Sequence, residues 1–82
     1  MNTSEKITQF ILEDLLSGES ATIEASTPLF SSGLIDSLGT LRLITFLEQE
    51  FGIEVGDGEV GDENFRSVER IAAFVEKKLA AA

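Results

Sequence analysis

Residues 36–52 read DSLGTLRLITFLEQEFG, and this stretch decides the fold. An aspartate opens it and a glycine closes it; these residue types are favoured at the start of a helix and just past its end. Between them, apolar residues recur every three or four positions, which is the spacing of one helix face. The stretch predicts a helix over residues 37–51 with Asp36 as its N-cap. Its inward stripe is Leu43, Ile44, Leu47 and Phe51.

This helix also has a second apolar side. Leu38 and Leu41 lie off the inward stripe, on the side shared with Arg42, Thr45 and Gln49. A helix with apolar residues on more than one side is either buried at the centre of a protein or exposes an apolar surface. We expect an exposed surface that binds a partner.

Two further helices are predicted. Residues 4–17 follow a capping-box pattern from Asn2 to Glu5, and Gly18 stands where a helix often ends. Residues 68–79 follow Ser67, a favourable N-cap. The first helix has an inward stripe of Ile7, Phe10, Ile11 and Leu15, and the last has Val68, Ile71, Ala72, Val75 and Leu79.

Long connections join these helices. Residues 18–36 lack strong periodicity, but their apolar residues are expected to anchor the loop on the core. Residues 52–66 are rich in glycine and end in a short helical turn that carries Phe65 inward. The sequence therefore predicts an all-α fold, a small four-helix bundle of three longer helices and one short helix, in one domain over 1–82. The expected core includes Leu43, Leu47, Phe51, Ile71 and Val75.

The composition excludes several classes of protein. The 82-residue chain has 15 acidic and 6 basic residues, and its formal net charge of −9 argues against binding to a nucleic-acid backbone. Without cysteine or histidine it lacks thiol chemistry, disulfides and the commonest general base and metal ligand. No apolar run is long enough to span a membrane, and no signal peptide is visible. A cytoplasmic protein is the expectation.

Motifs for catalysis and metal binding do not fit. Ser37 is not a nucleophile elbow, because Ile35 stands where that motif needs glycine, and a chain without histidine forms no Ser–His pair. The acidic segment that begins at Asp57 departs from the calcium-loop pattern at its fifth, sixth and twelfth positions. We predict neither catalytic residues nor a metal site.

The start of the predicted helix, Asp36-Ser37-Leu38, is the feature that bears on chemistry. Asp and Ser at a helix start can be a cap and nothing more. The unpaired N–H groups and the dipole of a first turn also favour a phosphate on the Ser37 hydroxyl. These residues alone leave both interpretations open.

A longer pattern surrounds this serine. Residues 33–41, GLIDSLGTL, resemble the attachment motif of acyl carrier and peptidyl carrier proteins. The resemblance covers nearly the whole chain, with PLF at 28–30, the pattern LxxxLxxEFGI at 43–53 and SVxxIA at 67–72.

The resemblance implies a carrier rather than an enzyme. Ser37 would carry 4′-phosphopantetheine, transferred from coenzyme A by a separate Mg²⁺-dependent phosphopantetheinyl transferase, beside Asp36 as the helix cap. The arm would hold an acyl or aminoacyl group as a thioester and present it to successive enzymes. The expected partner-binding residues are Leu38, Leu41, Arg42, Thr45 and Glu48.

Two positions depart from the carriers of fatty acid synthesis, which usually place acids where this chain has Gly39 and Arg42. Gly39-Thr40 is more similar to D-alanyl carrier proteins and free-standing peptidyl or aminoacyl carriers. The cargo stays open between an amino acid and a fatty or polyketide acyl chain. The expected partners are therefore an adenylating ligase, an acyltransferase or a synthase, and we expect a monomer.

The alternative hypothesis is an acidic helical interaction module without a prosthetic group, which binds proteins through Leu38 and Leu41. Seven acidic residues and no basic residue stand between positions 48 and 63. Such a field would speed encounter with basic partners, although surface acids also simply keep a small protein soluble.

Overall fold

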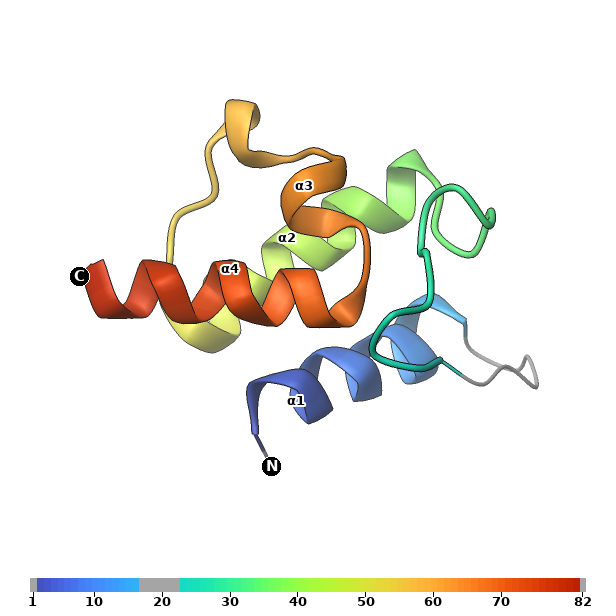
Figure 1. The fold of residues 1–82 in the computed structure, drawn as a ribbon, viewed down its shortest axis with the longest axis horizontal. Coiled ribbons are helices and arrows are strands. Elements are labelled where there is room, and N and C mark those ends of the chain that lie inside the picture. The colour runs from blue at the N-terminus through green and yellow to red at the C-terminus, as the bar shows by residue number, and fades with distance from the viewer. Residues whose placement is uncertain (1, 17–22, 82) are drawn as a thin grey trace.

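A computed structural model describes residues 2–16 and 23–81, and all regular structure in this part of the chain is helical (Figure 1). The prediction of an all-α fold and a small helical bundle is confirmed. No helix in the described part is long and apolar enough to cross a bilayer. The elements are α1 (Thr3–Phe10), η1 (Ile11–Leu15), α2 (Ser37–Phe51), η2 (Asp57–Glu59), α3 (Asp62–Phe65) and α4 (Val68–Ala81).

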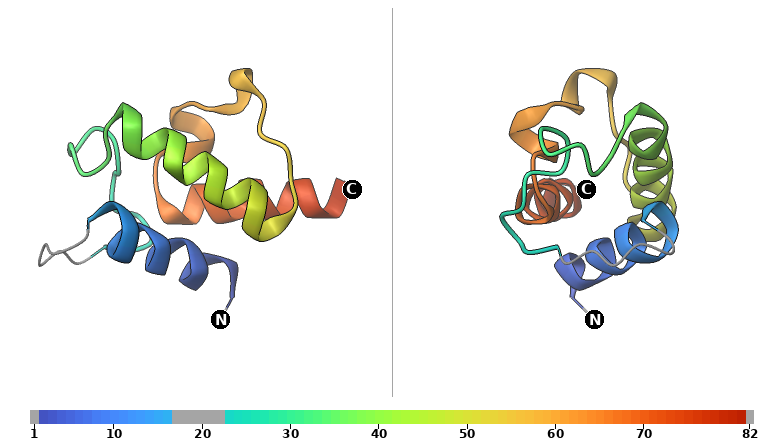
Figure 2. Two further views of the ribbon diagram at one scale, coloured as in Figure 1. Left: turned by 180° about the vertical axis from the view of Figure 1, so that it is seen from behind. Right: turned by 90° about the vertical axis from the view of Figure 1, so that its right-hand side faces the viewer.

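The last helix, α4, is the element against which the others pack. Both α1 and α3 contact it closely, and α2 lies against α1 and α4 (Figures 1 and 2). The long connection before α2 is tied to the start of α4 by backbone hydrogen bonds: Leu29 N–H donates to the Arg66 carbonyl (2.8 Å), and Glu69 N–H donates to the Ala25 carbonyl (3.0 Å). With Leu29 fully buried, the predicted anchoring of this loop is confirmed.

The first helix differs from the continuous α-helix predicted over 4–17. The capping box at Asn2 and Glu5 is present, with both of its hydrogen bonds. Past Phe10 the chain adopts a wider π-helical turn, closed by the Leu16 N–H and the Ile11 carbonyl at 2.9 Å. Leu16, which ends this turn, is buried in the core, as Ile11 is. Gly18, the predicted helix end, lies outside the described residues.

The core contains most of the predicted positions; of the predicted stripes, Phe10, Leu15, Ile44 and Phe51 are half-buried and pack against the core, and Leu79 is exposed. Leu43, Leu47, Ile71 and Val75 are fully buried, whereas Phe51 is only half-buried at the end of α2, where the Lys6 ammonium lies 5.8 Å from its ring centre. Leu79 is 44% exposed, because α4 extends past the helices it packs against (Figure 1). The remaining buried apolar residues are Ile7, Ile11, Leu16, Leu29, Ile35, Ile53, Phe65, Val68, Ala72 and Phe74.

Two carboxylates hold the connection between α2 and α3. Glu48 accepts the Val55 N–H (2.9 Å), and Glu59 accepts the next N–H, that of Gly56 (2.9 Å). Glu59 also meets the Lys78 ammonium of α4 at 2.7 Å. The middle of the glycine-rich segment is therefore bonded to α2 through Glu48 and to α4 through Glu59. Its short 3₁₀ turn, η2, was not predicted.

We expect the Glu59 contact to make stability depend on pH. The hydrogen bond from Lys78, and after it that from Gly56, lower the pKa of Glu59 below its ordinary value. The stabilisation is therefore complete above the pKa of an unfolded-state glutamate, and it is lost as the pH falls through the lower pKa of the folded state. Urea unfolding measured from neutral to acidic pH gives the free energy of unfolding as a function of pH. Glu59→Gln should make its decrease at acidic pH, the acidic limb of this profile, less steep.

Glu54→Gln is the matched control, because it removes one charge from an exposed position in the same connection. It should leave the acidic limb of the profile as in the wild type. Equal flattening by both variants would contradict the assignment of this limb to Glu59.

Candidate functional site

The start of α2 is built around the Asp36 side chain. Its Oδ1 accepts the Gly39 N–H at 2.8 Å, and its backbone carbonyl accepts both the N–H and the hydroxyl of Thr40, each at 2.9 Å. The bond from Gly39 satisfies an N–H that a helix start otherwise leaves unpaired, and the bond from the Thr40 N–H is the first regular bond of the helix. The predicted N-cap is confirmed, and Ser37 is the first helical residue, with an exposed side chain.

The segment before Asp36 holds this helix start in place. Gly33 adopts a positive φ of 81°, and its N–H donates to the Phe30 carbonyl (3.0 Å), which closes a turn. Ile35 is buried, and its N–H donates to the Leu29 carbonyl (3.0 Å). Because Leu29 and Ile35 are both anchored in the core, the chain enters α2 from a fixed direction.

Glycine at position 39 leaves room for this cap. A Cβ there would lie 3.1 Å from Ile35 Cγ2 and 3.3 Å from the Asp36 carboxylate oxygen. Both distances are tighter than ordinary van der Waals contact. Because Gly39 has no side chain, the buried Ile35 and the capping carboxylate of Asp36 can both pack against the first turn of α2.

The first turn of α2 suits a phosphate group on Ser37. Asp36 uses the Gly39 N–H, but among the described residues no protein acceptor is paired with the N–H groups of Ser37 and Leu38. These donors and the positive end of a 15-residue helix favour an anion at this point. The residues present therefore fit a phosphodiester-linked group, which these N–H groups would help to hold.

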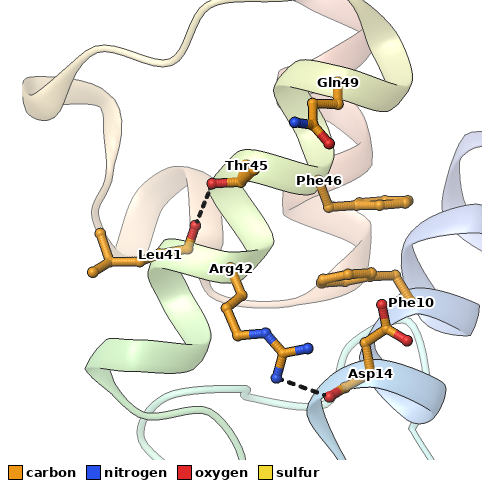
Figure 3. A pocket seen from close by; sticks show the side chains of 7 residues that line it. All are labelled: Phe10, Asp14, Leu41, Arg42, Thr45, Phe46 and Gln49. Atoms are coloured by element: carbon orange, nitrogen blue, oxygen red, sulfur yellow. Dashed lines mark hydrogen bonds between the residues drawn. The ribbon is translucent and has the colours of Figure 1, made fainter.

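The predicted partner-binding residues fall into two groups. Leu38 and Leu41 are 68% and 62% exposed, and with the exposed Thr45 they form the outer side of α2. Glu48 is half-buried and is bonded to the Val55 N–H, so it also holds the fold. Arg42 is exposed, but its guanidinium donates to the Asp14 carbonyl of η1 at 3.1 Å (Figure 3).

The Arg42 contact gives a physical reason for a base at this position. Asp14 lies at the C-terminal end of η1, where carbonyl groups lack helical partners and the dipole is negative. A guanidinium from α2 satisfies one of these carbonyls and ties the two helices together. An acid at position 42 would instead face the negative end of η1.

A stacked pair of phenylalanines beside Arg42 was not predicted. Phe10 and Phe46 have ring centres 4.2 Å apart and planes inclined by 12° (Figure 3). The stack lines a groove of about 410 Å³ together with Asp14, Leu41 and Thr45. The sequence shows each ring on its own helix, but it carries no signal that pairs them across the two helices.

In the described part of the chain, no group of three or more acidic side chains is arranged to hold a metal ion. This part includes the whole acidic segment from residue 48 to residue 63. The structure thus offers no support for a calcium loop.

Comparison with known proteins decides the family. Residues 6–75 match the family model described as "Phosphopantetheine attachment site". The chain belongs to this family of phosphopantetheine carriers. It carries a covalent 4′-phosphopantetheine group and is not itself an enzyme.

Similar proteins agree with this result. A probable acyl carrier protein, PigG of Serratia sp., is 32% identical over 72 residues, covering 88% of this chain and 83% of PigG. The D-alanyl carrier protein of Lacticaseibacillus casei is 33% identical over 67 residues, covering 82% and 83% of the two chains. A chain in a solved structure described as "Crystal structure of FAD-dependent dehydrogenase" superposes with a TM-score of 0.78 at 32% identity, covering 84% of this carrier and 97% of that chain.

Charge reversal at Arg42 tests its role at the end of η1. Arg42→Glu should lower the free energy of unfolding by about 1 kcal/mol, because it removes a hydrogen bond to a helix end and places an acid there. Urea denaturation followed by circular dichroism measures the change. Arg70→Glu is the charge-matched control and should cost nothing, since an acid is favoured near the start of α4. Equal losses in the two variants would contradict the role of Arg42.

Proposed function

We propose that Ser37 carries the phosphopantetheine arm and that this chain presents acyl or aminoacyl thioesters on it to partner enzymes in biosynthesis. The observation that carries the proposal is the exposed Ser37 directly behind the Asp36 cap, inside the matched family segment. Among the described residues no hydrogen bond uses the Ser37 hydroxyl. A group attached there displaces no contact that the fold needs.

Attachment is a phosphoryl transfer from coenzyme A. The Ser37 oxygen attacks the phosphorus next to the pantetheine, a new P–O bond forms, and the bond to the leaving 3′,5′-adenosine bisphosphate breaks. The serine proton passes to a base of the transferase. The contribution of the carrier is to hold its hydroxyl exposed, with the N–H groups of Ser37 and Leu38 beside the phosphate.

Partner enzymes would approach along the outer side of α2. Leu38 and Leu41 supply exposed apolar area next to Ser37, with Thr45 further along, Glu48 at one edge and Arg42 at the edge that faces η1. The partners are a phosphopantetheinyl transferase and an adenylating ligase, acyltransferase or synthase. We place this monomeric carrier in the cytoplasm, where coenzyme A supplies the arm.

We propose an amino acid as the cargo, although relatives include both a probable acyl carrier protein and D-alanyl carrier proteins. Relatives include D-alanyl carrier proteins, and Gly39 and Arg42 depart from the carriers of fatty acid synthesis. The similarity to a chain in the FAD-dependent dehydrogenase structure supports such an enzyme as a further partner.

Mass spectrometry of the intact protein tests the proposal. Incubation with coenzyme A, Mg²⁺ and a broad-specificity transferase should add the mass of one phosphopantetheinyl group, located on Ser37 by peptide fragmentation. Ser37→Ala should stay folded, because the serine hydroxyl holds nothing in place, and it should gain no mass.

Two other results would count against the proposal. A wild-type protein that stays unmodified with several transferases would contradict it. So would a group attached at another serine. Partner binding that is tight and identical for the unmodified wild type and for Ser37→Ala would favour the alternative of an interaction module without a prosthetic group.

A further inference from the structure

An open groove runs between α1–η1 and α2 (Figure 3). Next to its 410 Å³ hollow lies a second hollow of about 310 Å³ along the same helices, and the two share Phe10, Asp14 and Phe46 as walls. The rings of Phe10 and Phe46 are stacked face to face and each is only half-buried, so their edges form an apolar wall of the groove (Figure 3). Such a surface can cover a small apolar group.

A carboxylate without a cation stands at the edge of this surface. Asp14 is exposed, and no ion pair within 4.0 Å in the described part of the chain involves it. Two bases line the hollows: Arg42 bonds to the backbone carbonyl of Asp14 (3.1 Å), and Lys6 pairs with Glu50 (3.3 Å), so neither forms an ion pair with the Asp14 carboxylate. The groove therefore complements a ligand that has an ammonium group beside an apolar group.

The arm of the carrier would reach this groove. Ser37 begins the helix that forms one wall, and Thr45, which also lines the groove, lies eight positions on, about 12 Å along the helix axis. Leu41 stands halfway between them and is 62% exposed. An arm that starts at Ser37 would follow the outer side of α2 and pass over Thr45 and Arg42 to reach the aromatic rings between α2 and α1.

We propose that this groove is a resting site for aminoacyl cargo on the Ser37 arm. The α-ammonium of the cargo pairs with the Asp14 carboxylate, and the side chain of the cargo lies against the rings of Phe10 and Phe46. This inference rests on the proposed function. An acyl chain has no ammonium to offer, so the groove favours aminoacyl cargo over simple acyl cargo.

The test uses a stable form of the cargo. A transferase loads the full-length protein with a pantetheine arm that carries leucine through an amide bond, so that the cargo is not hydrolysed. Two-dimensional NMR should then show shifts of the Thr45 and Phe46 amides relative to the protein with a bare arm. Nuclear Overhauser contacts should join the leucyl methyl groups to the rings of Phe10 and Phe46.

The role of Asp14 is tested by removing either charge of the pair. Asp14→Asn, or an arm that carries N-acetyl-leucine, should reduce these contacts about two- to fivefold, the range for an exposed ion pair. Glu76→Gln removes one charge from an exposed position of α4 and should leave them unchanged. Equal contacts for the leucyl and acetyl-leucyl arms would overturn the inference.

Other results would overturn it too. One is a cargo that contacts the hollow lined by Phe30, Thr40 and Val60 instead of the groove; another is a loaded protein with no cargo contacts at all. In both cases the carrier function stands. A failure to gain the mass of the arm on Ser37 would overturn the proposed function and this inference with it.

Discussion

The hydrogen bond from the Gly39 N–H to the Asp36 carboxylate fixes where α2 begins, and the placement of Ser37 depends on it. The buried Ile35 holds the chain just before the cap, and the buried Leu43 holds the helix two turns later. Every contact that fixes the site is therefore made by the neighbours of Ser37. The serine itself stays free to accept a large group without a change in the fold.

The sides of α2 make different contacts. One side lies in the core, another meets α1 through Phe46 and Arg42, and the outer side beside Ser37 is left apolar and exposed.

The acidic residues between positions 48 and 63 fall into two groups. Glu48, Glu50 and Glu59 make contacts within the protein, so part of the negative charge stabilises the fold. The acids of the same stretch whose carboxylates make neither an ion pair nor a hydrogen bond in the described residues are Glu54, Asp57 and Glu63, so these three are the candidates for the predicted attraction of basic partners.

Local signals in the sequence predicted the helix boundaries well. Asp36 at the start of α2, the left-handed Gly52 at its end and Ser67 before α4 act within one turn of chain, so residue type and spacing are enough to identify them. The contacts between helices were not predictable in this way. Three features depend on how α1 and α2 meet: the π-helical turn after Phe10, the Phe10–Phe46 stack and the bond from Arg42. The exposure of Leu79 depends on how far α4 extends past the other helices.

Hydrogen exchange at the Gly39 amide tests the central claim most directly. If the Asp36 carboxylate fixes the start of α2, this amide is protected in the unmodified protein, while the Ser37 and Leu38 amides exchange quickly. Asp36→Ala then removes the protection of Gly39 but leaves that of Leu47, in the middle of the helix, unchanged. A Gly39 amide that exchanges as fast in the wild type as in Asp36→Ala would contradict the account.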